Sequence, residues 1–427
     1  MTLGFVVSFF DFRNDVRKVI EILSQNHKIV VFYKPADEEK VLSHKIGNVE
    51  YRPILDRNRN VSNRIKEQLF LFFKKLPKSR NNYFLMELFK ISNLDNNKAI
   101  RKGKFILKMQ KILPRLMSYD QLLKTLKPAY KTEISDIDQF IVFSEVADDY
   151  FMARLIKERK KIKFYVYSWD HPFKHTRFPS YPEYLCWSQG LKDDLSEMQH
   201  IPKSHISVIG ASQFGYVYEF NKKLSGGLVQ RTFPFEYIYF GCALGIRELV
   251  PAELTIVKQL AETTLKIRPD LKFVVRPYPL LEQWNLYDEI RSLANVVLDD
   301  DFRKKGSGIN DQSIMEKFEK IKHATAFLHL GTTMGLEACF TDTPAFIVDF
   351  SSKKKGHLSM YSFVHQTQNE KYLLTASSKN TLKTVDDYIL FLQNSNSPSY
   401  HDFNQKVKEQ FPLSSFQEFS QRLINDR

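Results

Sequence analysis

The chain is 427 residues long, too many for one ordinary hydrophobic core, so its length predicts two domains. Hydrophobic residues make up 43% and charged residues 26% of it, which are values of a globular protein and not of a disordered or membrane-spanning one. The formal net charge of +14 concerns the protein's partners and says nothing about its fold.

Several features bear on the compartment. Cys186, Cys242 and Cys339 are far apart and each lies in an apolar stretch, so we expect buried free thiols in a reducing compartment and no disulfide or zinc site. The residues MTLGFVVSFFDFRND lack the basic start and cleavage site of a signal peptide. No run reaches the roughly 18 to 20 apolar residues that cross a bilayer. These features predict a cytoplasmic protein.

Short apolar strands alternate with helices through residues 1–222. The predicted strands are LGFVVSFF, KIVVFYK, VEYRPIL, QFIVFSE, KIKFYVYSWD, EYLCWS and HISVIGA, with helices near 16–24, 149–159 and 191–198. Continuous apolar strands separated by helices indicate parallel sheets covered on both faces. We therefore expect a first Rossmann-like domain over residues 1–222.

Residues 66–117 interrupt this alternation with a basic helical insertion. The window contains 13 Lys/Arg and 3 Asp/Glu, a net charge of +10, and is rich in Phe, Leu, Ile and Met. Basic residues interleaved with large apolar ones at helical spacing suit a helix that lies on an anionic membrane surface. The alternatives are core-packing helices with solvated basic backs, or a surface for a partner or an acidic substrate. No nucleic-acid-binding module accompanies the window.

The alternation stops near residues 216–234, where a Gly-Gly pair and scattered charge predict the domain boundary at 223–232. It resumes with the strands EYIYFGCALG, LKFVVRPYP and NVVLDDD, and with two more within residues 326–350. We expect a second Rossmann-like domain over 233–383 and a helical tail over 384–427. The carboxyl ends of the two sheets would then face a central cleft.

The segment FLHLGTTMGLEACF, residues 327–340, runs from a predicted strand through Gly331, Thr332 and Thr333 into a predicted helix. The first N–H groups of a helix lack partners within it, and together with the helix dipole they suit phosphate oxygens. Threonine caps a helix and offers a hydroxyl, and glycine lets a ligand approach the backbone. Glu337 lies one turn beyond Thr333, where a carboxylate suits ribose hydroxyls. The alternative is an ordinary capped helix with a solvated Glu337.

The order of strand, G-T-T, G-L-E-A, proline-containing turn and strand resembles the nucleotide-binding half of GT-B-fold glycosyltransferases, in particular bacterial capsule, O-antigen and teichoic-acid-type transferases. Residues 165–212 are similar to a stretch of the same enzymes. The resemblance implies that Thr332 and Thr333 contact the diphosphate and that Glu337 holds the donor ribose. Only Pro344 is kept from the Gly-x-Pro turn that is usual after the helix.

The segment FVVRPYPLLE, residues 273–282, is similar to the RxHP segment of these transferases. Arg276 would put a fixed positive charge at a strand end, where it suits a phosphate. Tyr278 stands where histidine is usual, and it would donate to a phosphate or stack on a base. The alternative is a strand-end arginine paired with a nearby carboxylate.

Candidate proton acceptors follow predicted strands of the first domain. Asp170 and His171 lie in SWDHP, and Asp11 ends the first strand. Each could take a proton from an acceptor hydroxyl, and the alternative for each is helix capping or a salt bridge.

In the second domain, Gly241 would let a donor phosphate approach, Arg247 would neutralise it, and Glu248 is a weaker catalytic candidate. We expect no metal site, because residues 299–301, three consecutive aspartates, are typical of a solvated turn with a helix cap. The resemblance also implies that no metal is needed, because GT-B enzymes do not depend on a divalent ion. The phosphate-loop motif G-x-x-x-x-G-K-[ST] and the hydrolase motif G-x-S-x-G are both missing from the sequence.

The resemblance implies an α/β, GT-B-like fold of two Rossmann-like doubly wound domains with C-terminal helices. It further implies a metal-independent glycosyltransferase without a cofactor, which moves a sugar from a nucleotide-activated donor to a growing cell-surface glycan such as capsule or lipopolysaccharide. The acceptor would be a glycan or lipid-linked glycan at the cytoplasmic membrane face, with residues 66–117 on the anionic surface. The alternatives are a CMP-ulosonic-acid or CDP-polyol-phosphate transferase, a nucleotide-sugar 2-epimerase, or an inactive nucleotide-binding subunit.

Overall fold

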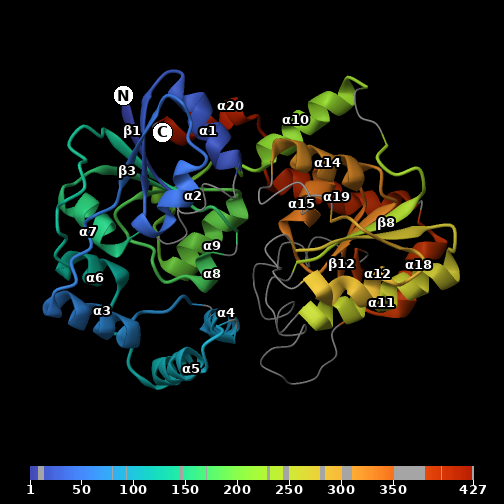
Figure 1. The fold of residues 1–427 in the computed structure, drawn as a ribbon, viewed down its shortest axis with the longest axis horizontal. Helices are drawn as coiled ribbons and strands as arrows, with labels where there is room; N and C mark the ends of the chain where they lie inside the picture. The colour runs from blue at the N-terminus through green and yellow to red at the C-terminus, as the bar shows by residue number, and fades with distance from the viewer. Residues whose placement is uncertain are drawn as a thin grey trace. The chain divides into compact units, whose positions relative to one another are not determined.

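The computed structural model describes residues 1–7, 14–78, 80–92, 94–143, 148–169, 171–227, 231–243, 250–278, 284–300, 310–350, 380–395 and 397–425. The chain forms two compact units. The first contains Met1–Glu87, Asn96–Gly215 and Phe411–Arg427, and the second contains Leu88–Asp95 and Tyr216–Gln410. Each unit is built around one parallel sheet flanked by helices (Figure 1).

The sheet of the first unit has the strand order β3-β2-β1-β4-β5-β6-β7, and all its pairs are parallel. Its strands are β1 (Thr2–Val6), β2 (Lys28–Tyr33), β3 (Val49–Pro53), β4 (Gln139–Val142), β5 (Lys161–Tyr165), β6 (Glu183–Cys186) and β7 (Ile206–Val208). Every residue of β4 is buried, as expected for a central parallel strand with helices on both faces.

The first unit also contains α1 (Asn14–Ser24), η1 (Pro35–Asp37), α2 (Glu38–Leu42), α3 (Val61–Phe73), α4 (Arg80–Ser92, which continues into the second unit), α5 (Asn97–Ile112), α6 (Tyr119–Thr125), α7 (Asp149–Lys157), α8 (His171–Lys174), α9 (Gln189–Gln199), η2 (Lys203–His205) and α20 (Phe416–Ile424). The last helix, α20, returns to pack against α1. Phe419 of α20 contacts Tyr165, with ring centroids 5.4 Å apart, and Lys163 Nζ donates to the carbonyl of Ile424 at 3.0 Å.

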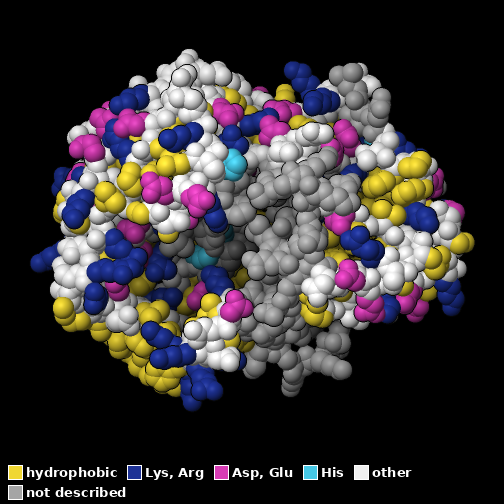
Figure 2. Space-filling model, viewed as in Figure 1, with side chains coloured by type: hydrophobic (Ala, Val, Ile, Leu, Met, Phe, Trp, Pro, Cys, Tyr) yellow, Lys and Arg dark blue, Asp and Glu magenta, His cyan; other side chains and the backbone are white. Residues whose placement is uncertain are grey.

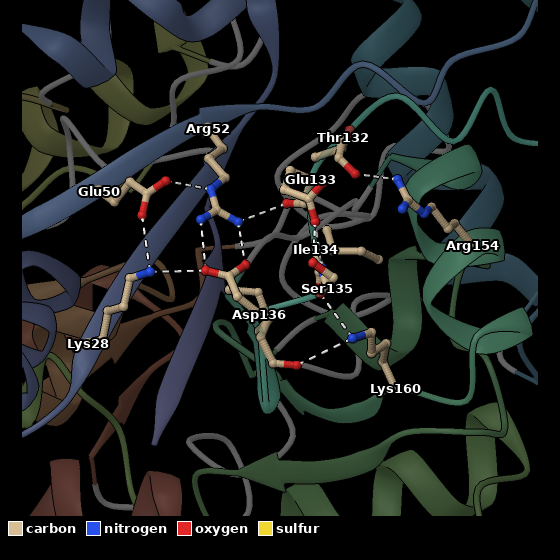
Figure 3. Close-up of polar contacts among 11 residues, drawn as sticks. Lys28, Glu50, Arg52, Thr132, Glu133, Ile134, Ser135, Asp136, Arg154 and Lys160 are labelled. Atoms are coloured by element: carbon tan, nitrogen blue, oxygen red, sulfur yellow. Dashed lines mark hydrogen bonds and ion pairs between the residues drawn. The ribbon is translucent and has the colours of Figure 1, made fainter.

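A polar cluster fixes the amino-terminal edge of this sheet (Figure 3). Arg52 of β3 donates to both carboxylate oxygens of Asp136, at 2.7 and 2.9 Å, and Lys28 at the start of β2 donates to the same carboxylate at 3.0 Å. Lys160 donates to the carbonyl of Ile134 at 2.9 Å. The cluster therefore ties β2 and β3 to the segment that leads into β4. It lies at the edge opposite the carboxyl ends of the strands.

The second sheet has the order β10-β9-β8-β11-β12-β13 and is also fully parallel. Its strands are β8 (Tyr237–Gly241), β9 (Lys272–Arg276), β10 (Val296–Leu298), β11 (Ala326–His329), β12 (Ala345–Val348) and β13 (Thr381–Leu382). Its helices are α11 (Val250–Ile267), η3 (Trp284–Tyr287), α12 (Asp288–Arg291), α14 (Asp311–Lys322), α15 (Thr333–Phe340), α18 (Val385–Gln393), η5 (Pro398–His401) and α19 (Asp402–Gln410). Helices α11, α12 and α18 cover one face of the sheet, and α14, α15 and α19 cover the other (Figure 1).

In both sheets the strand order reverses next to the first strand, between β1 and β4 and between β8 and β11. This is the order of doubly wound dinucleotide-binding folds. The predicted pair of Rossmann-like sheets is confirmed. The three cysteines are free and buried, as predicted. In the described part of the chain, no helix is both long enough and apolar enough to span a bilayer.

The unit borders differ from the predicted domain limits of 222, 233 and 383. Helix α10 (Phe214–Ser225) is continuous, and the chain passes from one unit to the other at Gly215 and Tyr216, inside this helix. The segment 384–427 is divided, since α18 and α19 belong to the second unit and α20 to the first. Local composition marks flexible linkers, and it cannot show that one continuous helix belongs to two units.

Candidate functional site

The strand-order reversal of the second sheet carries the predicted nucleotide-binding turn. Strands β8 and β11 are neighbours, and Gly241 at the end of β8 pairs in register with His329 at the end of β11. Because all strands are parallel, the residues after β8, β9 and β11 lie at one edge of the sheet. Ligands of open α/β sheets bind at this edge, where the strand order reverses.

The turn after β11 has the predicted strand–turn–helix form. Gly331 has a φ angle of 114°, in the left-handed region that favours glycine. Thr332 is the N-cap of α15, with extended φ and ψ angles of −118° and 154°. Its hydroxyl accepts from the Met334 N–H at 3.4 Å, so the predicted threonine cap is present. Thr333 is the first residue of the helix.

His329 lies beneath this turn and is fully buried. Its Nδ1 accepts from the N–H groups of Gly331, at 2.9 Å, and Thr332, at 3.3 Å. Burial lowers the pKa of His329 to about 3, so the ring is neutral at neutral pH and carries its proton on Nε2. Sequence reasoning missed this histidine. The available signal was a polar residue in the last position of an otherwise apolar strand.

These hydrogen bonds determine which groups of the turn are left for a ligand. The N–H groups of Gly331 and Thr332 are taken by His329, and that of Met334 by the Thr332 hydroxyl. No described residue bonds the N–H or the hydroxyl of Thr333. The positive end of the α15 dipole lies at the same point. An anion at this turn would therefore meet Thr333 first.

Glu337 lies one turn further along α15 and is 6% exposed. Its Oε2 accepts from Lys317 Nζ of α14 at 2.6 Å, and both side chains are largely buried. The alternative interpretation, an ordinary capped helix with a solvated Glu337, is wrong in one respect: Glu337 is not solvated, because Lys317 of α14 pairs with its carboxylate beneath the turn. Sequence reasoning missed Lys317, since nothing local relates it to Glu337, 20 residues away.

Arg276 at the end of β9 is part of a buried ionic cluster. Its Nη1 donates to Asp299 Oδ2 at 2.6 Å, and Asp299 also accepts from Lys320 Nζ and the Tyr239 hydroxyl, each at 2.5 Å. Burial by itself would raise the pKa of Asp299, but the charges of Arg276 and Lys320 hold that pKa below its ordinary value. The structure thus has the predicted alternative, an arginine paired with a carboxylate.

The prediction that residues 299–301 form a solvated turn is wrong for two of the three residues, which are buried. Asp299 is 2% exposed and Asp300 is 6% exposed. Asp300 accepts from Arg291 Nη2 at 2.8 Å. Cations from β9, α12 and α14 converge on these carboxylates, and such long-range neighbours are invisible in the local sequence. Asp301 lies outside the described residues.

Two further predicted residues lie at this edge. Gly241 ends β8, and a Cβ at this position would lie 2.6 Å from the Phe327 ring, so packing alone requires glycine. Tyr278 follows β9 by two residues and is partly buried. Arg247 and Glu248 lie outside the described residues.

The first unit has a polar cluster at the corresponding edge of its sheet. The Asp15 carboxylate, in the first turn of α1, accepts from the Tyr167 hydroxyl at 3.0 Å and from Ser212 Oγ at 2.6 Å. His171 begins α8, is 5% exposed and contacts His175, with ring centroids 5.0 Å apart. Sequence reasoning missed Asp15. The candidates Asp11 and Asp170 lie outside the described residues.

Within the described ranges, no group of three or more His, Cys, Asp and Glu side chains is arranged to hold a metal ion.

No protein-family profile and no curated protein sequence matches the chain. Solved structures do match it. The UDP-GlcNAc 2-epimerases of Neisseria meningitidis, bound to UDP-GlcNAc, and of Methanocaldococcus jannaschii, in complex with UDP-GlcNAc and UDP, are each 12% identical to it. Each alignment covers 99% of this chain and 98% of the other, with a TM-score of 0.51. The wall teichoic acid polymerase TagF matches at 10% identity over 99% of this chain and 86% of its own, with a TM-score of 0.47. The two epimerase alignments show that this chain has the GT-B-like fold.

Proposed function

We propose that this protein is a GT-B-type enzyme that binds a nucleotide-activated sugar at the carboxyl edge of its second sheet. It transfers the glycosyl group to a growing surface glycan at the cytoplasmic face of the membrane, without a metal or cofactor. The observation that carries this proposal is the G-T-T turn at the strand-order reversal, with the Glu337 carboxylate fixed one turn below it.

In this proposal, Thr333 binds the donor diphosphate through its N–H and hydroxyl, and the Thr332 hydroxyl and the α15 dipole add to the binding. These groups stabilise the leaving phosphate as its negative charge develops. Glu337 accepts hydrogen bonds from the donor ribose. His329 has no proposed contact with the donor. It holds two backbone N–H groups of the turn in place. Because Arg276 is paired with Asp299, its proposed role is secondary.

The proton acceptor is proposed among the first unit's candidates. Asp170 or His171 would take the proton of the acceptor hydroxyl, with Asp11, and Glu248 of the second unit, as weaker candidates. The described His171 is buried beside His175.

A second candidate function is nucleotide-sugar 2-epimerisation. Two of the aligned structures, each with a TM-score of 0.51, are UDP-GlcNAc 2-epimerases. The two reactions share a nucleotide-sugar site and differ in the need for an acceptor. We favour transfer because of the basic, apolar surface of α3 and α5, which an epimerase of free nucleotide sugars does not need. The same fold would also suit transfer from CMP-ulosonic acid or CDP-polyol phosphate, or an inactive subunit that only binds the nucleotide.

Product analysis tests this proposal. The full chain is incubated with each nucleotide sugar, with and without membrane extract as the acceptor source, and the products are identified by NMR. We expect release of free nucleotide that depends on the acceptor and is lost in Glu337→Ala but kept in the exposed control Glu262→Ala. An epimeric nucleotide sugar formed without acceptor would establish the second candidate instead.

A further inference from the structure

Large apolar side chains are exposed on α3, on α5 and just after α5. Six of them, between 47% and 72% exposed, are Val61, Ile65, Leu69, Phe105, Ile112 and Leu116. Figure 2 shows hydrophobic side chains gathered with Lys and Arg side chains over these two helices. Single exposed apolar residues are ordinary on protein surfaces, whereas a contiguous group of this kind marks an interaction surface.

The apolar residues of α3 form one row. Val61, Ile65 and Leu69 are spaced by four residues, so they lie on one side of the helix. Together with Phe72 they line a shallow groove of about 350 Å³. The other side of the helix is packed, since Phe70 is buried with its ring centroid 5.9 Å from that of Tyr119.

Helix α5 has the same two-sided character. Its inner side carries Gln110, whose side chain donates to the carbonyl of Leu71 at 2.7 Å and accepts from the Tyr83 hydroxyl at 3.1 Å. Phe105 and Ile112 are seven residues apart and both exposed, so they lie together on the outer side. Helices α3 and α5 pack against each other, which makes the two rows parts of one surface.

This surface is strongly cationic. Residues 61–78 and 96–117 contain 12 Lys/Arg, of which Lys74 is buried, and a single acidic residue, Glu67. Glu67 accepts from the Tyr150 hydroxyl of α7 at 3.0 Å, so its carboxylate points into the unit. Among described residues, no acidic side chain pairs with the exposed Lys104 or Lys108, which neighbour Phe105. Long cationic side chains beside exposed apolar ones suit an interface in which the apolar parts enter and the charges stay at its border.

We propose that α3 and α5 form the surface by which this protein docks on an anionic lipid bilayer. The apolar rows would enter the boundary between headgroups and acyl chains, and the Lys and Arg side chains would lie at the level of the lipid phosphates. Charge complementarity favours a bilayer, because a nucleic acid would use the cations and leave the apolar rows exposed. The inference deepens the proposed function and rests on its lipid-linked acceptor.

Vesicle flotation of the full chain tests the docking surface. We expect binding to vesicles that contain about one-third phosphatidylglycerol in phosphatidylcholine, weaker binding at high salt, and little binding to phosphatidylcholine alone. Lys104→Gln with Lys108→Gln should weaken binding about 25-fold, about fivefold for each charge. The matched control, Lys222→Gln with Lys223→Gln on α10 of the second unit, should bind like the unchanged protein.

A second pair of variants tests the apolar rows. Ile65→Gln with Phe105→Gln should weaken vesicle binding by at least about tenfold. Leu265→Gln with Leu390→Gln, which replaces two exposed leucines of the second unit, should leave binding unchanged. Circular dichroism and unfolding midpoints of all four variants establish that each is folded.

The outcomes separate docking from the proposed enzyme. Binding to anionic vesicles that both surface variants lose, in a protein without nucleotide affinity, would support docking and leave the proposed function unsupported. Equal binding by surface variants and controls, or no binding to anionic vesicles by a protein that binds nucleotide, would overturn docking and remove the reason to favour transfer over epimerisation, while the nucleotide site would stand. Self-association that Ile65→Gln with Phe105→Gln abolishes, without vesicle binding, would also overturn docking and assign the surface to a second copy of the chain.

Discussion

His329 and Gly335 are in contact beneath the G-T-T turn, and a Cβ added to Gly335 would lie 2.3 Å from His329 Nε2. The other ring nitrogen of His329 holds the N–H groups of Gly331 and Thr332. The glycine in the helix and the shape of the turn are therefore linked through one buried ring. This link accounts for a glycine in the G-L-E-A segment without any reference to a ligand.

Replacing this glycine should deform the turn. We expect Gly335→Ala to lower the free energy of unfolding by about 1–3 kcal/mol, as overpacking does, and to weaken nucleotide binding. Urea unfolding and calorimetry measure the two effects. The control is Gly47→Ala, where a Cβ meets no atom within 4 Å. If both variants unfold at the same midpoint, the ring contact does not constrain the turn.

The buried neutral His329 should make stability depend on pH. Its pKa is about 6.5 when unfolded and about 3 when folded, so below pH 6.5 the unfolded chain takes up the proton first. The stabilisation is complete above the unfolded pKa and falls by about 1 kcal/mol per pH unit as the pH decreases toward the folded value. Guanidinium unfolding at pH 6.5 and pH 5 measures this slope. His329→Gln should lower the slope by this amount, and an unchanged slope would contradict the account.

The Glu337 carboxylate should distinguish ribose from deoxyribose. If it accepts hydrogen bonds from the donor ribose, a ribonucleotide binds more tightly than its 2′-deoxy form, by about 1.5–3 kcal/mol for a bond to a charged group. Glu337→Gln should reduce this difference, and competition calorimetry measures it. Identical discrimination by both proteins would place the ribose elsewhere.

The Lys317–Glu337 pair should matter for folding as well. Lys317→Met leaves a largely buried carboxylate without its cation, and we expect a loss of about 3–5 kcal/mol in the free energy of unfolding. The exposed pair of Lys258 and Glu289 provides the control, because Lys258→Met should cost less than about 1 kcal/mol. Comparable losses at the two sites would show that the Lys317–Glu337 pair is not electrostatically isolated from solvent.

Arg276 has two possible roles, a contact with the donor phosphate or a structural ion pair, and one substitution distinguishes them. The resemblance to GT-B transferases implies a phosphate contact, whereas the structure pairs Arg276 with Asp299 inside the unit. We expect Asp299→Asn to destabilise the protein by about 3–5 kcal/mol, since it leaves Arg276 and Lys320 buried beside a neutral group. Asp300→Asn, which frees the more exposed Arg291, should cost less. A stable Asp299→Asn protein would favour Arg276 as a phosphate contact.

Local pattern was sufficient for much of the fold. Apolar strands such as Phe140–Val142 and the turn at Gly331 could be predicted because strand burial and helix capping depend on neighbouring residues. Both parallel sheets followed from the alternation of strands with helices, whereas the order of the strands within each sheet, and so the reversal points, came from the structure. The division of α10 between the units also came from the structure, because it depends on tertiary packing.

The ionic partners within the site could not be predicted in the same way. Lys317 and Lys320 reach their carboxylates from α14, across 20 and 21 residues of sequence. A single sequence does not show which residues so far apart along the chain come into contact. Lys317 and Lys320 belong to the polar helix α14 and look solvated until the packing of that helix is known, which is why local pattern predicts more exposed surroundings for Asp299 and Glu337.

The most direct test of the central claim, that the G-T-T turn binds a nucleotide, is calorimetry of UDP, GDP, dTDP, CMP and CDP with the full chain and with Thr333→Val. The account predicts micromolar binding of one nucleotide and a loss of at least about tenfold in Thr333→Val, which lacks the hydroxyl that no described residue engages. The control is Thr263→Val, whose hydroxyl bonds its own helix. A folded protein that binds none of the five nucleotides, or that binds one equally well with and without the Thr333 hydroxyl, would contradict the account.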